Sequence, residues 1–575
     1  MGAEGRMPSD LDKQFDAVLA AVTAPVGGRV LIGKDEQGRA IVTNFPATLP
    51  VLFDIFCTLN GATEAVIAGD ERLTFADLNT HGTRLAHALA GRGIAKGDRV
   101  AIAMRNCPSW IVAYMAAVKA GAIATLVNGW WQPEELAHGL SLTAPKLVIA
   151  DAGRSRRIEA TGLGLDIVTL EIEARLDEAL RPLLDGASAD APLPEITPED
   201  DATILFTSGS TGKSKGAVST HRAVTTGVYA YAMGIITLLG IKESIGQPPP
   251  HPPKTLVNVP LFHVTGEVPV MLNSFVIGRG MVLMPKWDPG EALRLIERET
   301  ITYFVGVPTM SLELMQHPDR DRYDLSSLTD IAAGGAARPV AHVQRLQDSF
   351  RGAQPALGYG LTETNAVGCS NFWSNYADKP SSTGRAQKPI VQLAILGDDG
   401  RHLPVGERGE VAIRSAANIR GYWNDPAATA AAFTADGHFR TGDVGYLDED
   451  GYLFIVDRLK DIIIRGGENI SAQEVEAACY AHQLVSEASV FGVPDERLGE
   501  VPGAVIHCET GSMDAQALTA FLQDRLAAFK LPAHIWFHPD PLPKLGTGKI
   551  DKVSLRARYR GQVQGSGQDN QTRAS

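Results

Sequence analysis

Cysteine is scarce in this sequence. Its 575 residues include only five cysteines, and no two of them form a Cys-x-x-Cys pair. An odd and scattered set argues against a disulfide framework or a zinc ribbon and favours a reducing compartment. Residues 1–9 carry charge but no apolar segment, so we expect no signal peptide. Together these absences predict a cytoplasmic protein.

An excess of basic residues is also missing. The 53 Lys and Arg residues are outnumbered by 66 Asp and Glu residues, which gives a net charge of −13. Such a charge argues against nucleic acid as the main partner. The apolar share of 44% and charged share of 21% exclude collagen, extended disorder and a multi-span membrane protein. At about 100–200 residues per domain, the length suggests about three or four core-sized units.

One stretch, from Ala223 to Ile241, carries no charge and approaches the length of a membrane span. It also includes three threonines and two tyrosines, which are unusual in a purely lipid-facing helix. We therefore expect a buried helix in an α/β core, with a membrane-contacting element as the alternative.

Between about residues 60 and 370 the sequence alternates strand-like and helix-like segments. Residues 65–68, 100–104 and 122–127 are strand candidates, and Thr74 can cap the helix that follows it. This alternation predicts mostly parallel sheets covered by helices. Residues 390–457 instead predict hairpins, because Asp399-Gly400 and Asp450-Gly451 are turn dipeptides between apolar runs.

We therefore expect an α/β fold with a large multi-lobed N-terminal domain and a small, mobile α+β C-terminal domain. The large domain should hold two βαβ-type sheet subdomains and a small β-hairpin subdomain. Ser471 and Glu474 form a capping box at the start of a helix in the small domain. The predicted boundaries are a partly mobile lead segment at 1–50, the large domain at 51–457, a charged junction at 458–461, the small domain at 462–560 and a disordered tail at 561–575.

The most informative stretch runs from Phe206 to Gly216 and reads Phe-Thr-Ser-Gly-Ser-Thr-Gly-Lys-Ser-Lys-Gly. Its small residues let backbone N–H and side-chain O–H groups surround a polyphosphate, while lysine adds positive charge. A P-loop kinase or ATPase is rejected, because Walker A spacing requires glycine where Thr207 stands. A flexible surface linker is the other alternative, but a linker needs neither the strand-like segment before it nor two lysines.

The segment 207–212 followed by Lys215-Gly216 resembles the phosphate-binding loop of the adenylate-forming superfamily. That superfamily contains acyl- and aryl-CoA synthetases, luciferases and adenylation domains. Four more segments match in the superfamily's order, from about residue 60 to 552. The resemblance implies that ATP or AMP is contacted by Thr207, Ser208, Gly209, Ser210, Thr211, Gly212, Lys215, Gly335, Ala336, Gly358, Tyr359, Gly360, Thr362, Asp443, Arg458 and Lys549.

The second matching segment reads Gly-Tyr-Gly-Leu-Thr-Glu-Thr over residues 358–364. The resemblance implies that Thr362 meets the nucleotide phosphate, that Glu363 orders Mg²⁺ and that the Tyr359 ring stacks near adenine. The chemistry agrees, since Mg²⁺ prefers one or two carboxylates together with phosphate oxygens and water. Without the resemblance, a glutamate after a glycine turn is more often solvated.

The third matching segment is Thr441-Gly442-Asp443, with Arg458 downstream. The resemblance implies that Asp443 accepts both ribose hydroxyls and that Arg458 joins it at the ribose. A carboxylate is a natural acceptor for two neighbouring O–H donors. A turn residue and a surface ion pair are the alternative interpretations of these two residues.

The fourth matching segment is Gly334-Gly335-Ala336, with residues 305–309 upstream. It resembles the lining of the acyl pocket and the adenine slot, and tight strand–helix packing is compatible with the same glycines. The predicted acyl pocket contains Phe262, Val305, Gly306, Gly334, Leu361 and Val367. Such apolar and small residues suit a fatty, aryl or polycyclic carboxylic acid. An amino acid is disfavoured, because residues 262–263 offer no carboxylate to pair with an ammonium group.

The fifth matching segment, residues 541–550, contains Lys549. The resemblance implies that this lysine reaches from the small domain to the reacting carboxylate and α-phosphate. His263 matches the aromatic or histidine residue beside that carboxylate, with a satisfied core histidine as the alternative. The predicted catalytic residues are therefore Lys549, His263, Glu363 and Thr362.

The resemblance also implies that the small domain turns between two steps. Lys460 matches the hinge residue. Rotation of the small domain about Lys460 would bring the loop of Arg465, Gly466 and Gly467 to coenzyme A. The glycines of that loop would let the pantetheine arm pass close to the backbone.

The implied reaction activates a carboxylic acid with ATP to acyl-AMP, releases pyrophosphate and transfers the acyl group to CoA. Because no carrier domain follows Lys549, we favour CoA as the acceptor. The protein would then be an AMP-forming acid–CoA ligase, and fatty acid metabolism is one pathway in which such a ligase acts. The alternatives are an adenylation enzyme that loads a carrier protein, a luciferase-like oxygenase and an inactive nucleotide-binding regulator. We expect a monomer or homodimer without a transmembrane span, with peripheral membrane contact left open.

The sequence departs from the superfamily pattern at several positions. Ser214 and Ala472 each stand where proline is usual, and Trp130-Trp131 replaces Asn-Pro-type residues. The proline-rich stretch 247–253 looks inserted and is expected to form a stiff surface loop that shapes the path of the acid or a subunit contact.

Overall fold

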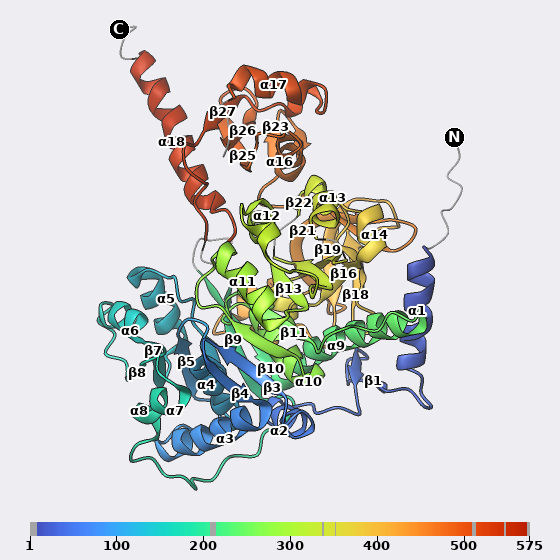
Figure 1. Cartoon of the computed structure of the whole chain (residues 1–575). Coiled ribbons are helices and arrows are strands. Elements are labelled where there is room, and N and C mark those ends of the chain that lie inside the picture. Colours follow the sequence, from blue (N-terminus) through green and yellow to red (C-terminus); the bar gives the residue numbers. More distant parts are fainter. Residues whose placement is uncertain are drawn as a thin grey trace.

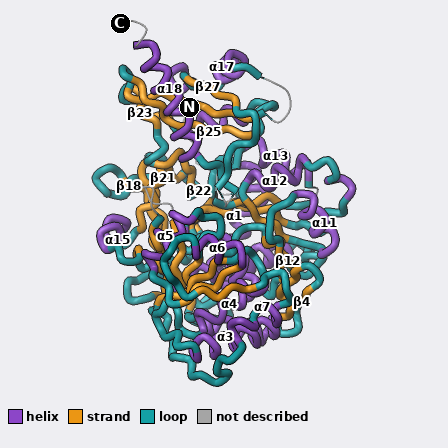
Figure 2. Tube along the Cα trace, turned by 90° about the vertical axis from the view of Figure 1, so that its left-hand side faces the viewer, coloured by secondary structure: helices purple, strands orange, loops and turns teal. Residues whose placement is uncertain are grey.

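The computed structural model describes residues 9–207, 214–335, 338–350, 352–508, 513–545 and 548–571. Figure 1 shows a large N-terminal part with a smaller C-terminal part above it. The same arrangement appears after a quarter turn in Figure 2, where the strands of the smaller part lie at the top. The expected α/β architecture, a large domain with several sheets and a small C-terminal domain, is confirmed.

The first sheet has seven strands in the order β20-β10-β9-β6-β5-β7-β8. Strands β5 to β9 run parallel, whereas β10 is antiparallel to both of its neighbours. The strands are β5 (Arg99–Ala103), β6 (Ile123–Leu126), β7 (Leu147–Asp151), β8 (Ile167–Leu170), β9 (Asp201–Thr207), β10 (Lys215–Thr220) and β20 (Gly421–Tyr422). The intervening helices are α3 (Phe75–Gly91), α4 (Pro108–Lys119), α5 (Pro133–Thr143), α6 (Ala152–Glu159), α7 (Leu176–Ala179) and α8 (Arg181–Leu184). The central strands are buried along their whole length, as helix-covered parallel strands are.

The second sheet has thirteen strands in the order β18-β19-β21-β22-β17-β16-β15-β14-β13-β11-β12-β3-β4. Its parallel part contains β3 (Glu64–Ala68), β11 (Lys254–Val257), β12 (Gly280–Leu283), β13 (Tyr303–Gly306), β14 (Asp330–Ala333) and β15 (Gln354–Gly360), with β4 (Glu71–Thr74) at the edge. Its helices are α2 (Leu49–Leu59), α9 (His221–Ser244), the π-helix η1 (Gly266–Leu272), α10 (Asn273–Ile277), α11 (Pro289–Glu299), α12 (Pro308–Gln316), η2 (Arg320–Arg322), α13 (Val340–Ser349), η3 (Thr362–Thr364) and α14 (Trp373–Asp378). The site described below lies where β13, β14 and β15 end.

The expected hairpin strands are present but do not form a sheet of their own. Within 390–457 they are β18 (Gln392–Leu396), β19 (Gly409–Arg414), β21 (Phe439–Leu447) and β22 (Tyr452–Arg458), with α15 (Pro426–Ala432) between them. Two further strands, β16 (Gly368–Phe372) and β17 (Gly384–Ala386), precede them. Strand β17 pairs with both β16 and β22, so the hairpins extend the second sheet. Gly400 and Gly451 adopt φ of 77° and 78° at the two predicted turns, a conformation that glycine permits.

The lead segment, predicted to be partly mobile, contains secondary structure from Asp10 onwards. Helix α1 (Asp10–Val22) packs against α9, and Figure 1 shows α9 running across towards the upright α1. The buried Asp12 carboxylate accepts hydrogen bonds from Asn375, Arg385 and Tyr452. These partners are distant in sequence, which explains why the local pattern does not reveal the helix. A short hairpin, β1 (Ile32–Lys34) with β2 (Ala40–Val42), follows, and residues 1–8 lie outside the described residues.

The uncharged stretch 223–241 lies in α9, as expected for a core helix. Among the described residues, α9 is the one helix long and apolar enough to cross a membrane, judged by length and composition alone. It contacts α1, α10 and η1, and most of its middle is buried inside the protein. Packing on several sides therefore accounts for its composition without a bilayer.

The C-terminal domain is a five-stranded sheet flanked by helices. The elements are β23 (Ile463–Arg465), β24 (Glu468–Ile470), α16 (Ala472–Tyr480), β25 (Glu487–Asp495), β26 (Gly499–His507), α17 (Ala515–Gln523), η4 (Ala528–Lys530), β27 (His534–Phe537) and α18 (Lys552–Gln571). Ser471 caps α16 by accepting from the Glu474 N–H, which is one half of the predicted capping box, while the Glu474 carboxylate pairs with Lys530 instead. Helix α18 continues to Gln571, and the disorder predicted for 561–575 stays a prediction. Leu555 and Tyr559 anchor its first turns, and extending a formed helix costs less than starting one.

Candidate active site

The hairpin of β9 and β10 carries the two ends of the phosphate loop. Thr207 pairs opposite Lys215 across this antiparallel hairpin. The Lys215 ammonium lies 4.9 Å from the centre of the Tyr422 ring. The predicted phosphate contacts Ser208, Gly209, Ser210, Thr211 and Gly212 lie outside the described residues. The hairpin register thus brings a hydroxyl and an ammonium to the mouth of the same loop.

Glu363 lies in the short helix η3, directly after β15, and its side chain is buried. The Tyr422 hydroxyl donates to Glu363 Oε1 at 3.0 Å. Burial raises the pKa of this carboxyl, and hydrogen bonds from Tyr422 and Thr207 act in the opposite direction. Glu363 therefore lies beside the phosphate loop, with Thr362 next to it. Within the described residues it has no ion-pair partner, and a buried carboxylate among hydroxyls suits a hard divalent cation such as Mg²⁺.

Asp443 and Arg458 face each other on β21 and β22. Arg458 Nε lies 3.1 Å from Asp443 Oδ1, and the Tyr359 hydroxyl donates to Asp443 Oδ2 at 2.6 Å. A carboxylate offers about four lone-pair sites, so Asp443 keeps capacity to accept from further hydroxyls. Three residues predicted to surround the nucleoside are thus in direct contact.

Lys549 reaches this region from the C-terminal domain. A Cβ atom placed on Gly335 would lie 3.1 Å from Lys549 Cε and 3.4 Å from its Nζ. Loss of hydration lowers the pKa of Lys549 to about 8, helped by the charge of Arg458 and opposed by that of Asp443. The lysine ammonium therefore shares one site with the second-sheet glycines and with the Asp443–Arg458 pair. Ala336, the next predicted contact, lies outside the described residues.

His263 lies between β11 and η1, and it is close enough to Lys549 for the lysine charge to lower its pKa. The Thr265 N–H donates to His263 Nδ1 at 3.2 Å, which leaves the ring proton on Nε2. Burial, with a contribution from Lys549, lowers the pKa of His263 to about 3, so the ring is neutral near pH 7. A neutral ring with a free Nε2–H is suited to donate a hydrogen bond and not to carry charge.

The two tryptophans that replace the usual Asn-Pro residues fill space beside these elements. The Trp130 ring packs edge-on against Phe262 with 5.1 Å between ring centres, and Trp131 packs against Phe206 at 4.8 Å. They thus link the end of β9 to the His263 segment. Aromatic pairs in this geometry stabilise a fold beyond the area they bury.

The junction between the domains is held by polar contacts on both sides of Lys460. The Leu459 N–H donates to the Gly442 carbonyl at 2.9 Å, and Arg556 pairs with Asp461 at 2.8 Å. The buried Asp457 carboxylate accepts from the Ala472 N–H at 2.5 Å. Proline at residue 472 could not donate this bond, which gives a physical reason for the alanine found there.

The predicted CoA loop lies on the surface of the C-terminal domain. Gly466 and Gly467 are exposed in the turn between β23 and β24, with φ of 58° and 90°. Arg465 pairs with Gly499 of β26. In this arrangement Lys549 lies beside Asp443 and Arg458, the predicted nucleotide contacts, and the Arg465–Gly467 turn does not.

A cavity of about 440 Å³ leads away from Gly334 and Gly335. Of the predicted acyl-pocket residues, Val305 and Gly334 line it, together with Gly358, Gly360 and Ala366. Phe262, Gly306, Leu361 and Val367 do not line it. Val367 is fully buried in the hydrophobic core, and Gly306 faces Met310 and Asn258. The remaining wall comes from α9, β14, α1 and, through Pro249, His251 and Pro253, the proline-rich stretch.

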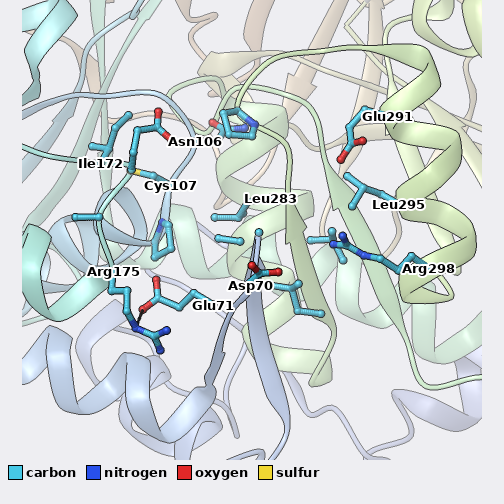
Figure 3. Close-up of a pocket in the computed structure, with 18 of the residues that line it drawn as sticks. Asp70, Glu71, Asn106, Cys107, Ile172, Arg175, Leu283, Glu291, Leu295 and Arg298 are labelled. Carbon is cyan, nitrogen blue, oxygen red and sulfur yellow. Dashed lines mark ion pairs between the residues drawn. The ribbon is translucent and has the colours of Figure 1, made fainter.

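A second cavity, of about 480 Å³, lies between β3, β12 and the α11 region (Figure 3). Its walls carry many charged residues, among them Asp70, Glu71, Arg175 and Arg298. Within this cavity, Arg175 Nε lies 3.9 Å from Glu71 Oε1. None of the residues predicted to bind ATP, CoA or the acid lines this cavity, so it is distinct from the candidate active site.

Comparison with protein-family models decides the family. Residues 53–423 match the AMP-binding enzyme model, and residues 474–549 match the model of the AMP-binding enzyme C-terminal domain. The chain belongs to the AMP-binding enzyme family. The resemblance drawn from the five sequence segments is thereby confirmed.

The relatives of this family member are acid–CoA ligases. A long-chain-fatty-acid–CoA ligase of Bacillus subtilis is 34% identical over 513 residues, which cover 84% of this chain and 89% of the relative. A feruloyl-CoA synthase of an Amycolatopsis species is 35% identical and covers 86% and 96%. The solved structure of a Mycobacterium tuberculosis fatty acyl CoA synthetase aligns with a TM-score of 0.70 at 31% identity, covering 90% of this chain and 99% of that one. This chain is therefore an AMP-forming acid–CoA ligase that works through an adenylate and uses ATP and CoA.

Sequence reasoning missed Tyr422 of this ligase. Its hydroxyl holds Glu363 and its ring faces Lys215, so it connects the carboxylate with the phosphate loop. Tyr422 lies in the two-residue strand β20, which pairs with β10 across a long sequence interval. In the sequence alone, Gly421-Tyr422 looks like one of many turn dipeptides. Only the pairing of β20 with β10 shows that Tyr422 lies beside the phosphate loop.

Proposed function

We propose that this ligase joins a fatty, aryl or polycyclic carboxylic acid to AMP at the site bounded by Glu363, Asp443 and Lys549. The observation that supports this most strongly is the position of Lys549, which the C-terminal domain brings to Gly335 beside the Asp443–Arg458 pair. Attack of a carboxylate on the α-phosphorus of ATP brings two anions together. A cationic side chain in a poorly hydrated cleft offsets that repulsion.

Each residue of the site then has a specific task. Asp443 accepts the ribose hydroxyls, Arg458 holds Asp443, and the phosphate loop with Lys215 binds the departing pyrophosphate. Lys549 donates to the reacting carboxylate and α-phosphate. The His263 Nε2–H orients the carboxylate, since its Nδ1 is already occupied by Thr265. Glu363 would hold Mg²⁺, which supplies positive charge against the phosphates when bound.

The second step needs a different arrangement of the domains. We infer that the C-terminal domain turns about Lys460, withdraws Lys549 and presents the loop Arg465–Gly467 to CoA. The exposed glycines of that loop leave room for the pantetheine arm next to the backbone. The CoA thiol then displaces AMP from the acyl-adenylate.

The acid class rests on the cavity and on the relatives. A volume of about 440 Å³ is within the range of pockets for drug-sized ligands. Its wall includes Leu238, Leu239, Val305 and Ala332, which suit an apolar body. The names of the relatives cover both long-chain fatty acids and the aryl acid ferulate. We further propose a cytoplasmic location and a monomer or homodimer.

One assay series tests the proposal. Carboxylate-dependent ATP–pyrophosphate exchange is measured over a panel of fatty, aryl and polycyclic acids, followed by thioester formation with CoA. We expect exchange that requires Mg²⁺ and an acid, and thioester with CoA. Exchange without a CoA thioester would favour carrier loading, oxygen uptake or light would favour a luciferase-like reaction, and absence of exchange with every acid would refute the proposal.

A further inference from the structure

The cavity beside Gly335 has a charged side chain at its other end. Arg279 precedes β12 and is only 2% exposed, yet it lines this cavity. Its Nε donates to Ser274 Oγ at 3.0 Å, and its Nη2 donates to the carbonyls of Pro269 and Val270 at 2.8 and 3.0 Å. The guanidinium is thereby fixed against the π-helix η1.

The charge of Arg279 has no counter-ion in the described part of the chain. The titratable neighbour that acts on its pKa is Tyr303, whose ring centre lies 4.9 Å from the guanidinium carbon and whose own pKa of about 12 keeps it neutral near pH 7. Burial lowers the pKa of Arg279 to about 10, so the group remains charged near pH 7. No hydrogen bond among the described residues uses its Nη1. The neutral acceptors Ser274, Pro269 and Val270 satisfy only part of this guanidinium, and a buried cation without a counter-ion is costly unless a further acceptor reaches it.

A second polar group lines the same cavity and also lacks a partner. Asn273 begins α10, one turn after Pro269, and is 1% exposed. Neither its amide nitrogen nor its amide oxygen has a hydrogen-bond partner among the described residues. Unpaired buried amides are rare, because a buried donor or acceptor that loses its hydrogen bond to water without replacement destabilises the fold. Asn273 and Arg279 therefore form an unpaired polar end of the cavity, whereas Lys242 and Asp330, which also line it, pair with each other at 3.4 Å.

Strand β13 gives the distance between the two ends. Arg279 stacks on Tyr303 at the start of β13, and the Gly334 N–H donates to the Gly306 carbonyl at its end. Three residues of strand span roughly 10 Å. The Pro253 carbonyl accepts from the Gly280 N–H at 3.0 Å, so the proline-rich stretch closes the cavity beside Arg279.

We propose that the acid activated by this ligase carries a second oxygen acceptor, a carbonyl or a carboxylate, at the end remote from the activated carboxylate, and that Arg279 and Asn273 bind it. This inference rests on the proposed function, since it assumes that the activated carboxylate lies beside Gly335 and Lys549. The apolar wall would hold the body of the acid, and the polar end would select its length. Arg279 and Asn273 are then residues that determine specificity for the acid.

The test compares matched acids on the full chain. ATP–pyrophosphate exchange is measured with octanoate, decanoate and dodecanoate, with the corresponding dicarboxylates, and with keto acids oxidised at the penultimate carbon. We expect kcat/KM for an oxygenated acid to exceed that of the plain acid of equal length at least tenfold at the best length. A preference for the dicarboxylate identifies an anionic group, and a preference for the keto acid identifies a carbonyl.

Variants assign the preference to the two residues. Arg279→Met and Asn273→Leu should each lower the ratio of oxygenated to plain kcat/KM, the former at least tenfold, while Arg279→Lys should restore part of it. Arg298→Met, a matched change at a surface arginine paired with Glu299, should leave the ratio unchanged. If Arg279→Met does not fold, the ratios of oxygenated to plain kcat/KM in Asn273→Leu and Arg279→Lys decide whether the two residues set the preference.

The outcomes separate this inference from the proposed function. Exchange with plain acids that equals or exceeds exchange with oxygenated acids at every length would overturn the inference alone. An unchanged ratio in both Arg279 and Asn273 variants would do the same. Failure of every acid to support exchange would overturn the proposed function itself.

Discussion

Lys544 of the C-terminal domain forms an ion pair with Glu313 of α12, with 3.2 Å between Nζ and Oε1. The same ammonium lies 3.0 Å from Glu487 of its own domain. Rotation of the small domain would therefore break one ion pair without leaving the lysine unpaired. A Cβ atom placed on Gly548 would lie 2.9 Å from Val307, so the domains also touch next to this pair.

The Lys544–Glu313 pair should bias the ligase towards adenylate formation. Both side chains are partly exposed, so the pair is worth at most about 1 kcal/mol. We expect Glu313→Gln to slow pyrophosphate exchange by up to about fivefold and to leave thioester formation from supplied acyl-adenylate unchanged. Glu291→Gln, which breaks an exposed pair on α11, serves as control. Equal slowing of both half-reactions would contradict the bias.

Lys549→Ala should affect the two half-reactions differently. Removing a preorganised charge donor from the reacting centre costs about 10²–10³-fold in rate. We expect that loss in pyrophosphate exchange and a much smaller change in thioester formation from supplied acyl-adenylate. Lys549→Arg keeps the charge but not the geometry and should fall between the two. Comparable loss in both half-reactions would show that Lys549 acts in some other way.

The rate of adenylate formation should fall at alkaline pH. The pKa of Lys549 is lowered to about 8, so its ammonium is charged below that pH and loses its proton above it. Because kcat/KM reports groups of the free enzyme, its profile for exchange should show an alkaline limb near pH 8. Lys549→Arg should move this limb to higher pH. A limb that stays in place in the arginine variant would assign it to another group.

Gly335→Ala should impair the same step through geometry. Gly335 has φ of +77°, which costs an L-residue roughly 1–2 kcal/mol, and its Cβ would displace Lys549. Gly334→Ala is the matched control, because its Cβ would have no heavy atom closer than 3.7 Å. We expect pyrophosphate exchange to fall at least tenfold in Gly335→Ala and far less in Gly334→Ala. Similar losses in both variants would argue against contact with Lys549.

The buried Glu267 should make stability depend on pH. Its Oε1 accepts from the Tyr114 hydroxyl at 2.8 Å, and burial raises its pKa from 4.5 to about 7. The folded state then holds its proton more tightly than the unfolded state, so this contribution is complete below pH 4.5 and is lost as pH rises through 7. The shift corresponds to about 3 kcal/mol.

Glu267→Gln tests this dependence, because it keeps the shape and cannot ionise. We expect the urea midpoints of the wild type and the variant to diverge between pH 5 and pH 8, with the variant relatively more stable at pH 8. Glu291→Gln, at an exposed site, should follow the wild type. Parallel midpoints for Glu267→Gln and the wild type would mean that Glu267 ionises without cost.

Features that depend on neighbouring residues could be predicted from the sequence. Thr74 forms the expected helix cap, with its hydroxyl accepting from the Asp77 N–H, and the two Asp-Gly dipeptides form the hairpin turns. The five segments and their order in the chain pointed to the family, because each is a short local pattern that can be recognised in the sequence alone. The structure then brings Glu363, Asp443 and Lys549 together, as the resemblance implies.

Features that depend on distant contacts could not be predicted. Asp12 is polar and lies in a weakly patterned segment, and its burial follows only from Arg385 and Tyr452. Arg279 likewise reads as a surface residue in a turn, and only the carbonyls of η1 and the cavity explain its burial. The cavity wall depends on distant contacts too: Gly306 and Val367 are next in sequence to the lining residues Val305 and Ala366, yet their own neighbours are core side chains.

Helix α1 places Leu11, Phe15 and Leu19 in the wall of the acid cavity. Because α1 forms part of this wall, a hydrophobic affinity tag fused ahead of the helix would compete with the acid if it folded back onto the cavity that we propose for the acid. Kinetic constants for this ligase are best measured after such a tag has been cleaved, or with the tag moved beyond α18.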